Sequence, residues 1–174
     1  MGVGWFDNLR GQASRPVPPP PKKRSMNNRD DVVDVLNHIL EMELAGVVRY
    51  THYSFMVYGY NRIPIVTWLR AQAQEGLLHA QEAGERITDL GEHPSLSIGP
   101  LLETHNHDMG AILREALEHE RQTLSLYHKL AELVQGGSIV LEEYARQKIF
   151  QEEMHMSEVD KMLRRPGDIA AFDS

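Results

Sequence analysis

The chain lacks several features that would point to other classes of protein. It contains no cysteine, which excludes disulfides, iron–sulfur clusters and thiolate metal sites, so any bound metal must take nitrogen and oxygen ligands. It also has no apolar run long enough to span a bilayer, and no apolar N-terminal stretch of the kind that a secretory signal needs. We therefore expect a cytoplasmic protein that has no membrane partner.

Basic residues are also scarce. The 174 residues include 18 Lys and Arg against 25 Asp and Glu, which gives a formal net charge of −7. A nucleic-acid-binding protein normally presents a basic face, so this balance argues against a nucleic-acid partner and is compatible with handling cations. The length suits one domain with a single core.

Proline is concentrated near the N-terminus. Five prolines lie between positions 16 and 21, and three basic residues follow at 22–24. Because proline cannot build a helix interior and favours an extended conformation, we interpret residues 1–25 as a tail or linker. The alternative is a docking peptide for a protein partner. Residues 26–165 form the predicted domain, and 166–174 are a short C-terminal tail.

Four stretches of helical period follow the tail. They cover about residues 30–58, 65–90, 107–134 and 138–163. Short turns at 59–64 and 135–137 force antiparallel neighbours, while the connection at 91–104 could span up to about 45 Å. We therefore predict an all-α, antiparallel four-helix bundle made of two helical hairpins joined by a long crossover.

Each predicted helix places a charged or imidazole side chain where its apolar stripe calls for a core residue. A buried carboxylate is costly unless it is paired or metal-bound. One such residue could be a boundary effect, but five of them, with at least one on each helix, indicate a shared polar centre. These residues are Glu43, His79, Glu120, Glu152 and His155.

Spacing indicates what this polar centre could hold. Glu152 and His155 form a Glu-x-x-His sequence, which puts both side chains on one face of a helix. Carboxylates and imidazoles suit iron, manganese or zinc, and bridging carboxylates suit a redox-active pair of ions. The spacing therefore predicts a metal centre inside the bundle.

The two halves of the chain resemble each other. Tyr50 follows Glu43 by seven residues, and Tyr127 follows Glu120 by seven residues. The histidine of each half follows the glutamate by 36 and 35 residues. A hairpin repeated about a twofold axis would place two metal ions symmetrically.

At these residues the sequence resembles the bacterioferritin family, over about residues 26–163. The matching segments are Leu36-Asn37, Glu43-Leu44 with Tyr50, His79-Ala80 with Arg86-Ile87, Glu120 with Tyr127, and Glu152-Glu153-Met154-His155. The resemblance implies a ferritin-like bundle that oxidises Fe(II) with dioxygen or peroxide and stores or detoxifies the ferric product. It also implies a homo-oligomer with a dimer as the smallest unit.

The resemblance implies a role for individual residues. The iron ligands would be Glu43, His79, Glu120, Glu152 and His155. Glu152 would bridge two iron ions, for which manganese or zinc could substitute. Tyr50 would lie beside the site and take part in the oxidation together with Glu43, Glu120 and Glu152.

The second helix departs from the family pattern at Gly76, where the family has a further glutamate. Glu75, four residues before His79, is the natural substitute, and we include it among the predicted metal ligands. Glu82, three residues after His79, is a second candidate. A glycine inside a helix costs up to about 1 kcal/mol relative to alanine, which suggests a purpose such as a local bulge that turns Glu75 inward.

Two further departures limit what the resemblance implies. Leu77 stands where the family has its haem-ligand methionine, which argues against haem. Residues 164–167 and a short tail replace the family's fifth helix, which leaves open whether a closed cage forms. Six histidines are predicted to lie on the surface or in loops: His38, His93, His105, His107, His119 and His128.

Two other functions remain compatible with the same fold. The metal centre could be static, in a bundle whose role is to bind a partner through residues 1–25. It could instead be a di-metal peroxidase or oxygenase, which would act on hydrogen peroxide or on an organic substrate.

Overall fold

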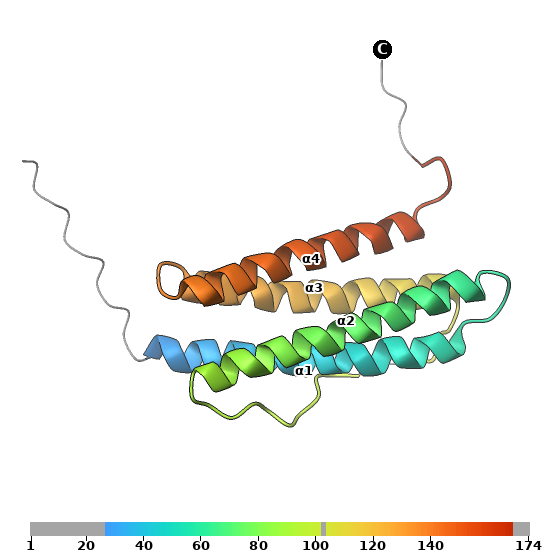
Figure 1. The fold of residues 1–174 in the computed structure, drawn as a ribbon. Coiled ribbons are helices and arrows are strands. Elements are labelled where there is room, and N and C mark those ends of the chain that lie inside the picture. The colour runs from blue at the N-terminus through green and yellow to red at the C-terminus, as the bar shows by residue number, and fades with distance from the viewer. Residues whose placement is uncertain (1–26, 102–103, 169–174) are drawn as a thin grey trace, which may run out of the picture.

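A computed structural model describes residues 27–101 and 104–168. It contains four helices, α1 (Asn27–Met56), α2 (Arg62–Asp89), α3 (Met109–Val134) and α4 (Ile139–Leu163), and no strand in the described residues (Figure 1). The predicted all-α bundle is confirmed, and each helix boundary lies within a few residues of its predicted position. The proposed tail at 1–25 falls outside the described residues.

The helices form two hairpins joined by a crossover. α1 packs on α2, α3 packs on α4, and α1 also packs on α3. The crossover is tied to α1, because the Gly99 amide donates a 2.8 Å hydrogen bond to the Glu41 carbonyl and the Ser95 amide donates one of 2.8 Å to Asn37 Oδ1. A Cβ atom at Gly99 would stand 3.0 Å from the Glu41 carbonyl oxygen, so this approach favours glycine.

Local signals set the helix ends. The side chain of Asp108 accepts a hydrogen bond from the Ala111 amide at the start of α3, and the side chain of Ser138 accepts one from Leu141 at the start of α4. Gly91, just after α2, has φ 77°, a conformation that glycine adopts without strain. Ser138 therefore caps α4.

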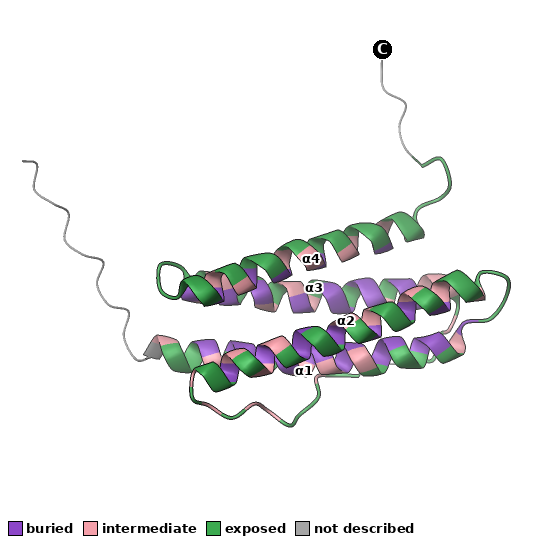
Figure 2. Cartoon of the chain, in the orientation of Figure 1, coloured by how far each residue is buried: buried purple, intermediate pink, exposed green. Residues whose placement is uncertain are grey.

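Buried residues occur along all four helices (Figure 2). The apolar ones form three clusters, of which the first includes Leu36 and Leu130, the second Tyr53 and Ile112, and the third Leu113 and Val159. The polar residues predicted to form a centre lie between these clusters along the helices. None of the described helices combines the length and the apolar character that crossing a membrane requires.

Candidate metal centre

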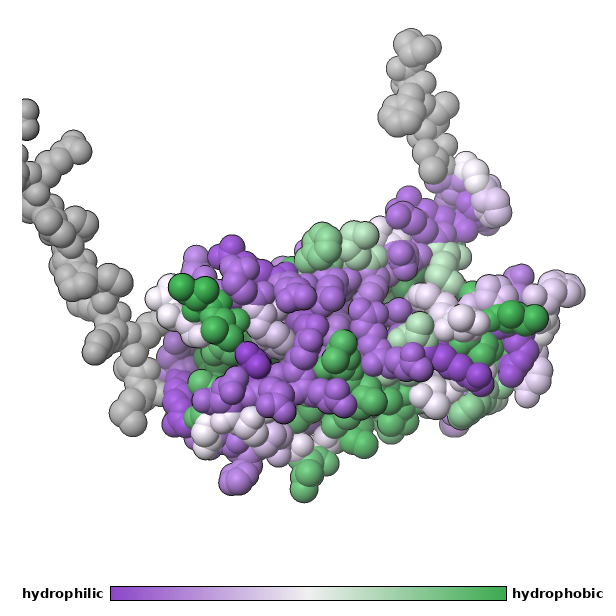
Figure 3. Space-filling model, in the orientation of Figure 1, coloured by the Kyte–Doolittle hydropathy of each residue, from purple (hydrophilic) through white to green (hydrophobic). Residues whose placement is uncertain are grey.

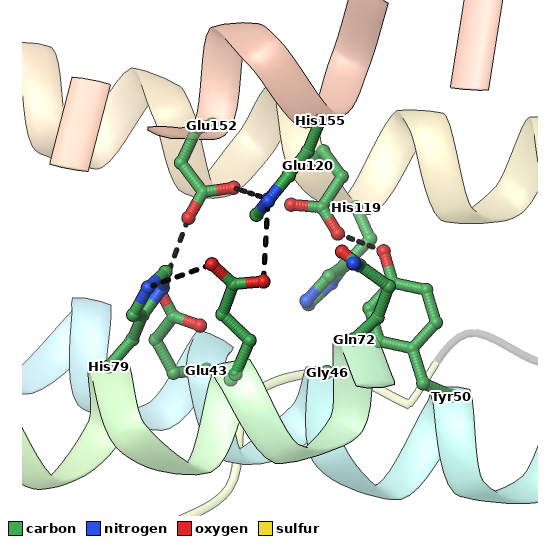
Figure 4. A pocket seen from close by; sticks show the side chains of 11 residues that line it. Glu43, Gly46, Tyr50, Gln72, His79, His119, Glu120, Glu152 and His155 are labelled. Carbon is green, nitrogen blue, oxygen red and sulfur yellow. Dashed lines mark hydrogen bonds and ion pairs between the residues drawn. The ribbon is translucent and has the colours of Figure 1, made fainter. Parts of the chain in front are cut away.

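One cavity inside the bundle brings together every residue predicted to bind metal. Its lining includes Glu43, Glu75, His79, Glu120, Glu152, His155 and the neighbouring Tyr50 (Figure 4). Gly46, Gln72 and His119 also line it, although these three residues were not among those predicted to form the site. All four helices contribute to the cavity, as the pattern of inward polar residues predicted.

Three of these residues converge on one point. Glu43, His79 and Glu152 are all buried, and each offers one ligand atom within 4.8 Å of the other two. His79 Nδ1 lies 3.4 Å from Glu43 Oε1 and 3.2 Å from Glu152 Oε1, yet neither contact has the geometry of a hydrogen bond. A buried nitrogen aimed between two carboxylate oxygens fits a metal cation.

A second group surrounds His155. Its Nε2 atom lies 3.3 Å from Glu75 Oε2, and its Nδ1 atom lies 3.8 Å from Glu152 Oε2. The other oxygen of Glu75 lies 3.8 Å from His79 Nε2, so this carboxylate reaches toward both histidines. Figure 4 shows Glu152 between His79 and His155, which is the position that a bridging carboxylate would take.

Two tyrosines orient carboxylates in this centre. Tyr127 on α3 donates a 2.7 Å hydrogen bond to Glu43 on α1. Tyr50 on α1 donates a hydrogen bond to Glu120 on α3 (Figure 4). The internal symmetry of the sequence thus corresponds to two reciprocal tyrosine–glutamate contacts, which connect the first and third helices.

Burial and repulsion between neighbouring carboxylates change the pKa values of the glutamates in this centre. Burial raises the pKa of Glu43, and it raises that of Glu120 well above its usual range, with the Glu152 charge adding to the effect on Glu120. Burial also opposes ionisation of Glu152, but interactions with His155, His79 and Glu120 outweigh it and lower the pKa of Glu152.

Burial acts on the pKa of the His79 imidazole in the opposite direction from its action on the carboxylates. Burial disfavours its charged form, but interactions with Glu152 and Glu43 outweigh burial and raise the pKa of His79 to about 9, against a smaller opposing effect of the Lys148 charge. Without metal, protons therefore partly neutralise the centre. A metal ion bound at this centre would have to displace them, so its binding would release protons.

The predicted surface position of His119 is wrong. Its side chain is 3% exposed, and its Nε2 atom lies 2.8 Å from the place where a Cβ of Gly46 would stand. Arg49 Nη1 lies 3.4 Å from the Nδ1 atom of His119. Burial, with the Arg49 charge second, lowers the pKa of His119 to about 4. The spacing of His119 from Ala116 and Thr123, both buried, was the signal that could have located it.

The structure also separates the two candidates for the missing ligand on α2. Glu75 lines the cavity, whereas Glu82 does not and instead forms an ion pair with Lys148. The predicted bulge at Gly76 is wrong, because α2 is a regular α-helix throughout this region. Glu75 therefore reaches the cavity from a straight helix.

Comparison with solved structures places this bundle among ferritin-like proteins. A ferritin-like, di-iron-carboxylate protein from Bacillus anthracis aligns with a TM-score of 0.76 and 23% identity, covering 80% of this chain and 100% of that one. The bacterioferritin of Desulfovibrio desulfuricans aligns with a TM-score of 0.72 and 20% identity, covering 79% and 80%. A dodecameric thioferritin related to bacterioferritin, from Bacteroides fragilis, aligns with a TM-score of 0.73 and 22% identity, covering 78% of this chain and 85% of that one.

These identities are low, so the structural matches establish the fold. No curated protein matches the sequence. The model of the ferritin-like domain matches residues 33–166, which include all four helices almost entirely. The chain therefore belongs to the ferritin-like domain family.

Proposed function

We propose that this protein binds two iron ions inside the bundle and oxidises Fe(II), in the service of iron storage or detoxification. The observation that carries the proposal is the convergence of Glu43, His79 and Glu152, whose ligand atoms lie within 4.8 Å of one another in a buried site. Burying carboxylates in a core is costly unless they are paired or bound to a cation, and here all four helices bring polar side chains to one site. A bound cation would offset this cost.

Among the described residues, Glu43, His79 and Glu152 are the group that brings three ligand atoms within 4.8 Å of one another, and a second ion would need the remaining donors to draw closer. Glu43, His79 and Glu152 would hold one ion, and Glu120, Glu152 and His155 would hold the other. Glu75 reaches toward both histidines and would complete the coordination on the side where the family glutamate is missing. Bound iron would supply one-electron redox chemistry, which no side chain of this centre offers.

As substrates, two Fe(II) ions lose one electron each. Dioxygen takes both electrons and two protons and leaves as hydrogen peroxide, or hydrogen peroxide takes them and leaves as two water molecules. The protein orients the carboxylates for this step through Tyr127, which donates to Glu43, and Tyr50, which donates to Glu120. It also keeps the centre buried between two apolar clusters.

The size of the cavity favours a small oxidant. Its free volume is about 20 Å³, enough for a molecule the size of water. An organic substrate would need several hundred Å³, on the order of 300 or more. This observation favours iron oxidation over the oxygenase alternative.

The proposal is tested by titrating the metal-free protein with Fe(II) under anaerobic conditions and then admitting air. We expect two tightly bound ions per subunit, followed by oxygen consumption much faster than in protein-free buffer. Metal uptake without accelerated oxidation would instead indicate a static centre in an interaction module.

A further inference from the structure

A lysine side chain is buried next to the metal centre. Lys148 on α4 is 2% exposed, although lysines are almost never fully buried unless they are paired. It precedes Glu152 by four residues, so the two side chains lie on the same face of the helix. The bundle therefore keeps an internal ammonium group within one helical turn of a candidate metal ligand.

The partner of this ammonium group comes from α2. Lys148 Nζ lies 2.5 Å from Glu82 Oε2 and donates a 3.1 Å hydrogen bond to Gln151 Oε1. Glu82 follows His79 by three residues, so the ion pair connects the two helices that also carry His79 and Glu152. The backbones of the described helices pack closely between α1 and α2, α3 and α4, and α1 and α3, whereas α2 and α4 meet through side chains, including the His79–Glu152 and Glu75–His155 contacts.

The two members of the ion pair differ in burial. The Glu82 side chain is 40% exposed, whereas that of Lys148 is 2% exposed. Removing Glu82 would therefore leave a buried cation without its carboxylate, which is a costly arrangement. A lysine and a glutamate four residues apart on a helix are within reach of each other, so Glu152 is the alternative partner on the same helix.

An ammonium group paired with Glu152 would oppose a metal ion, because both cations would require the same carboxylate oxygens. We propose that Glu82 is a positioning residue that holds the Lys148 ammonium away from Glu152 and so keeps that carboxylate open to metal. Glu82 then acts on metal binding through Lys148, without being a ligand. This inference rests on the proposed function, since it concerns competition for a metal-binding carboxylate.

The test is a titration of the metal-free protein with Co²⁺, followed by visible absorption, which reports on the ligands around the ion. Glu82→Gln should weaken Co²⁺ binding by about tenfold or more, the size of effect seen when supporting residues around metal ligands are changed. The double variant Glu82→Gln/Lys148→Met removes both charges and should restore binding to within about threefold of wild type. Glu85→Gln makes the same charge change at an exposed position of α2 and should leave binding unchanged.

Two results would overturn the inference. Wild-type affinity in Glu82→Gln would show that Glu82 restrains nothing, and weak binding in the double variant would show that the loss does not come from Lys148. If Glu82→Gln does not fold by circular dichroism, Lys148→Met decides, because loss of the competitor should leave binding at least as tight as in wild type. A wild-type protein that takes up no Co²⁺ would instead contradict the proposed metal binding itself.

Discussion

Tyr127 on α3 donates a 2.7 Å hydrogen bond to Glu43 on α1, and both side chains are buried. A residue of α3 therefore orients a carboxylate that belongs to α1. The reciprocal contact, from Tyr50 to Glu120, runs in the opposite direction between the same two helices. Glu43 and Glu120 are thus each oriented by a tyrosine of the other half of the chain.

Tyr127→Phe should weaken metal binding by about tenfold to a hundredfold, because it removes the donor that orients Glu43. Isothermal titration calorimetry with Co²⁺ would measure the change. Tyr60→Phe provides the control, since Tyr60 is fully exposed and should not affect binding. Equal affinities of Tyr127→Phe and wild type would show that this hydrogen bond does not organise the centre.

Glu75→Ala should weaken binding of the second metal ion and slow Fe(II) oxidation. The Glu75 carboxylate lies 3.3 Å from His155 and 3.8 Å from His79, where it could replace the missing ligand of α2. Metal counting after equilibrium dialysis should give fewer than two ions per subunit at metal concentrations that saturate the wild type. An unaffected variant would indicate a centre that works with the remaining ligands alone.

The fold and most of the centre could be predicted from the sequence because both depend on periodic placement along helices. Glu43 and Glu152 occupy positions in their apolar stripes where a charge is costly, and this identified them as inward-facing. Lys148 lies three residues after Ala145 and four before Glu152, so it shares their face of α4. Its burial nevertheless depends on Glu82, which comes from another helix. Pairing between helices leaves no periodic signal in either segment.

His119 was predicted incorrectly for a related physical reason. A histidine is common on surfaces, and only the packing of its ring against Gly46 on another helix makes its burial possible. The prediction of a bulge at Gly76 was wrong because one glycine destabilises a helix by only about 1 kcal/mol. That cost is small compared with the stabilisation that a helix of 28 residues gains from packing.

His119 should make the metal-free protein sensitive to mild acid. The folded protein lowers the pKa of His119 from 6.5 to about 4, so below pH 6.5 the unfolded chain takes up a proton that the folded chain does not. This contribution to stability therefore falls as the pH drops from 6.5 toward 4, by up to about 3 kcal/mol. Urea unfolding in the presence of a chelator should show a smaller acid loss for His119→Gln than for wild type. Parallel losses in both proteins would contradict the assignment.

The protein should form at least a dimer through the exposed faces of α1 and α2. Val48, Phe55, Leu77 and Leu78 are large apolar residues that remain exposed on these helices, and Figure 3 shows hydrophobic side chains gathered over this part of the surface. Light scattering at micromolar concentration should give the mass of a dimer or a larger assembly. Leu78→Glu should reduce that mass, because it places a charge in an apolar contact.

Ile139→Glu is the control for this prediction. Ile139 is also exposed and apolar, but it belongs to α4 and not to α1 or α2. A monomeric wild type, or dissociation by Ile139→Glu alone, would contradict an interface on α1 and α2.

The most direct test of the central claim is the initial rate of oxygen consumption after Fe(II) is added to Glu152→Ala. Glu152 lies between His79 and His155 and is the proposed bridge between the two ions. The neighbouring Glu153 is exposed, so Glu153→Ala is a matched control that should oxidise Fe(II) like the wild type. We predict that Glu152→Ala falls to the rate of protein-free buffer, whereas an undiminished rate in this variant would contradict oxidation at a carboxylate-bridged centre.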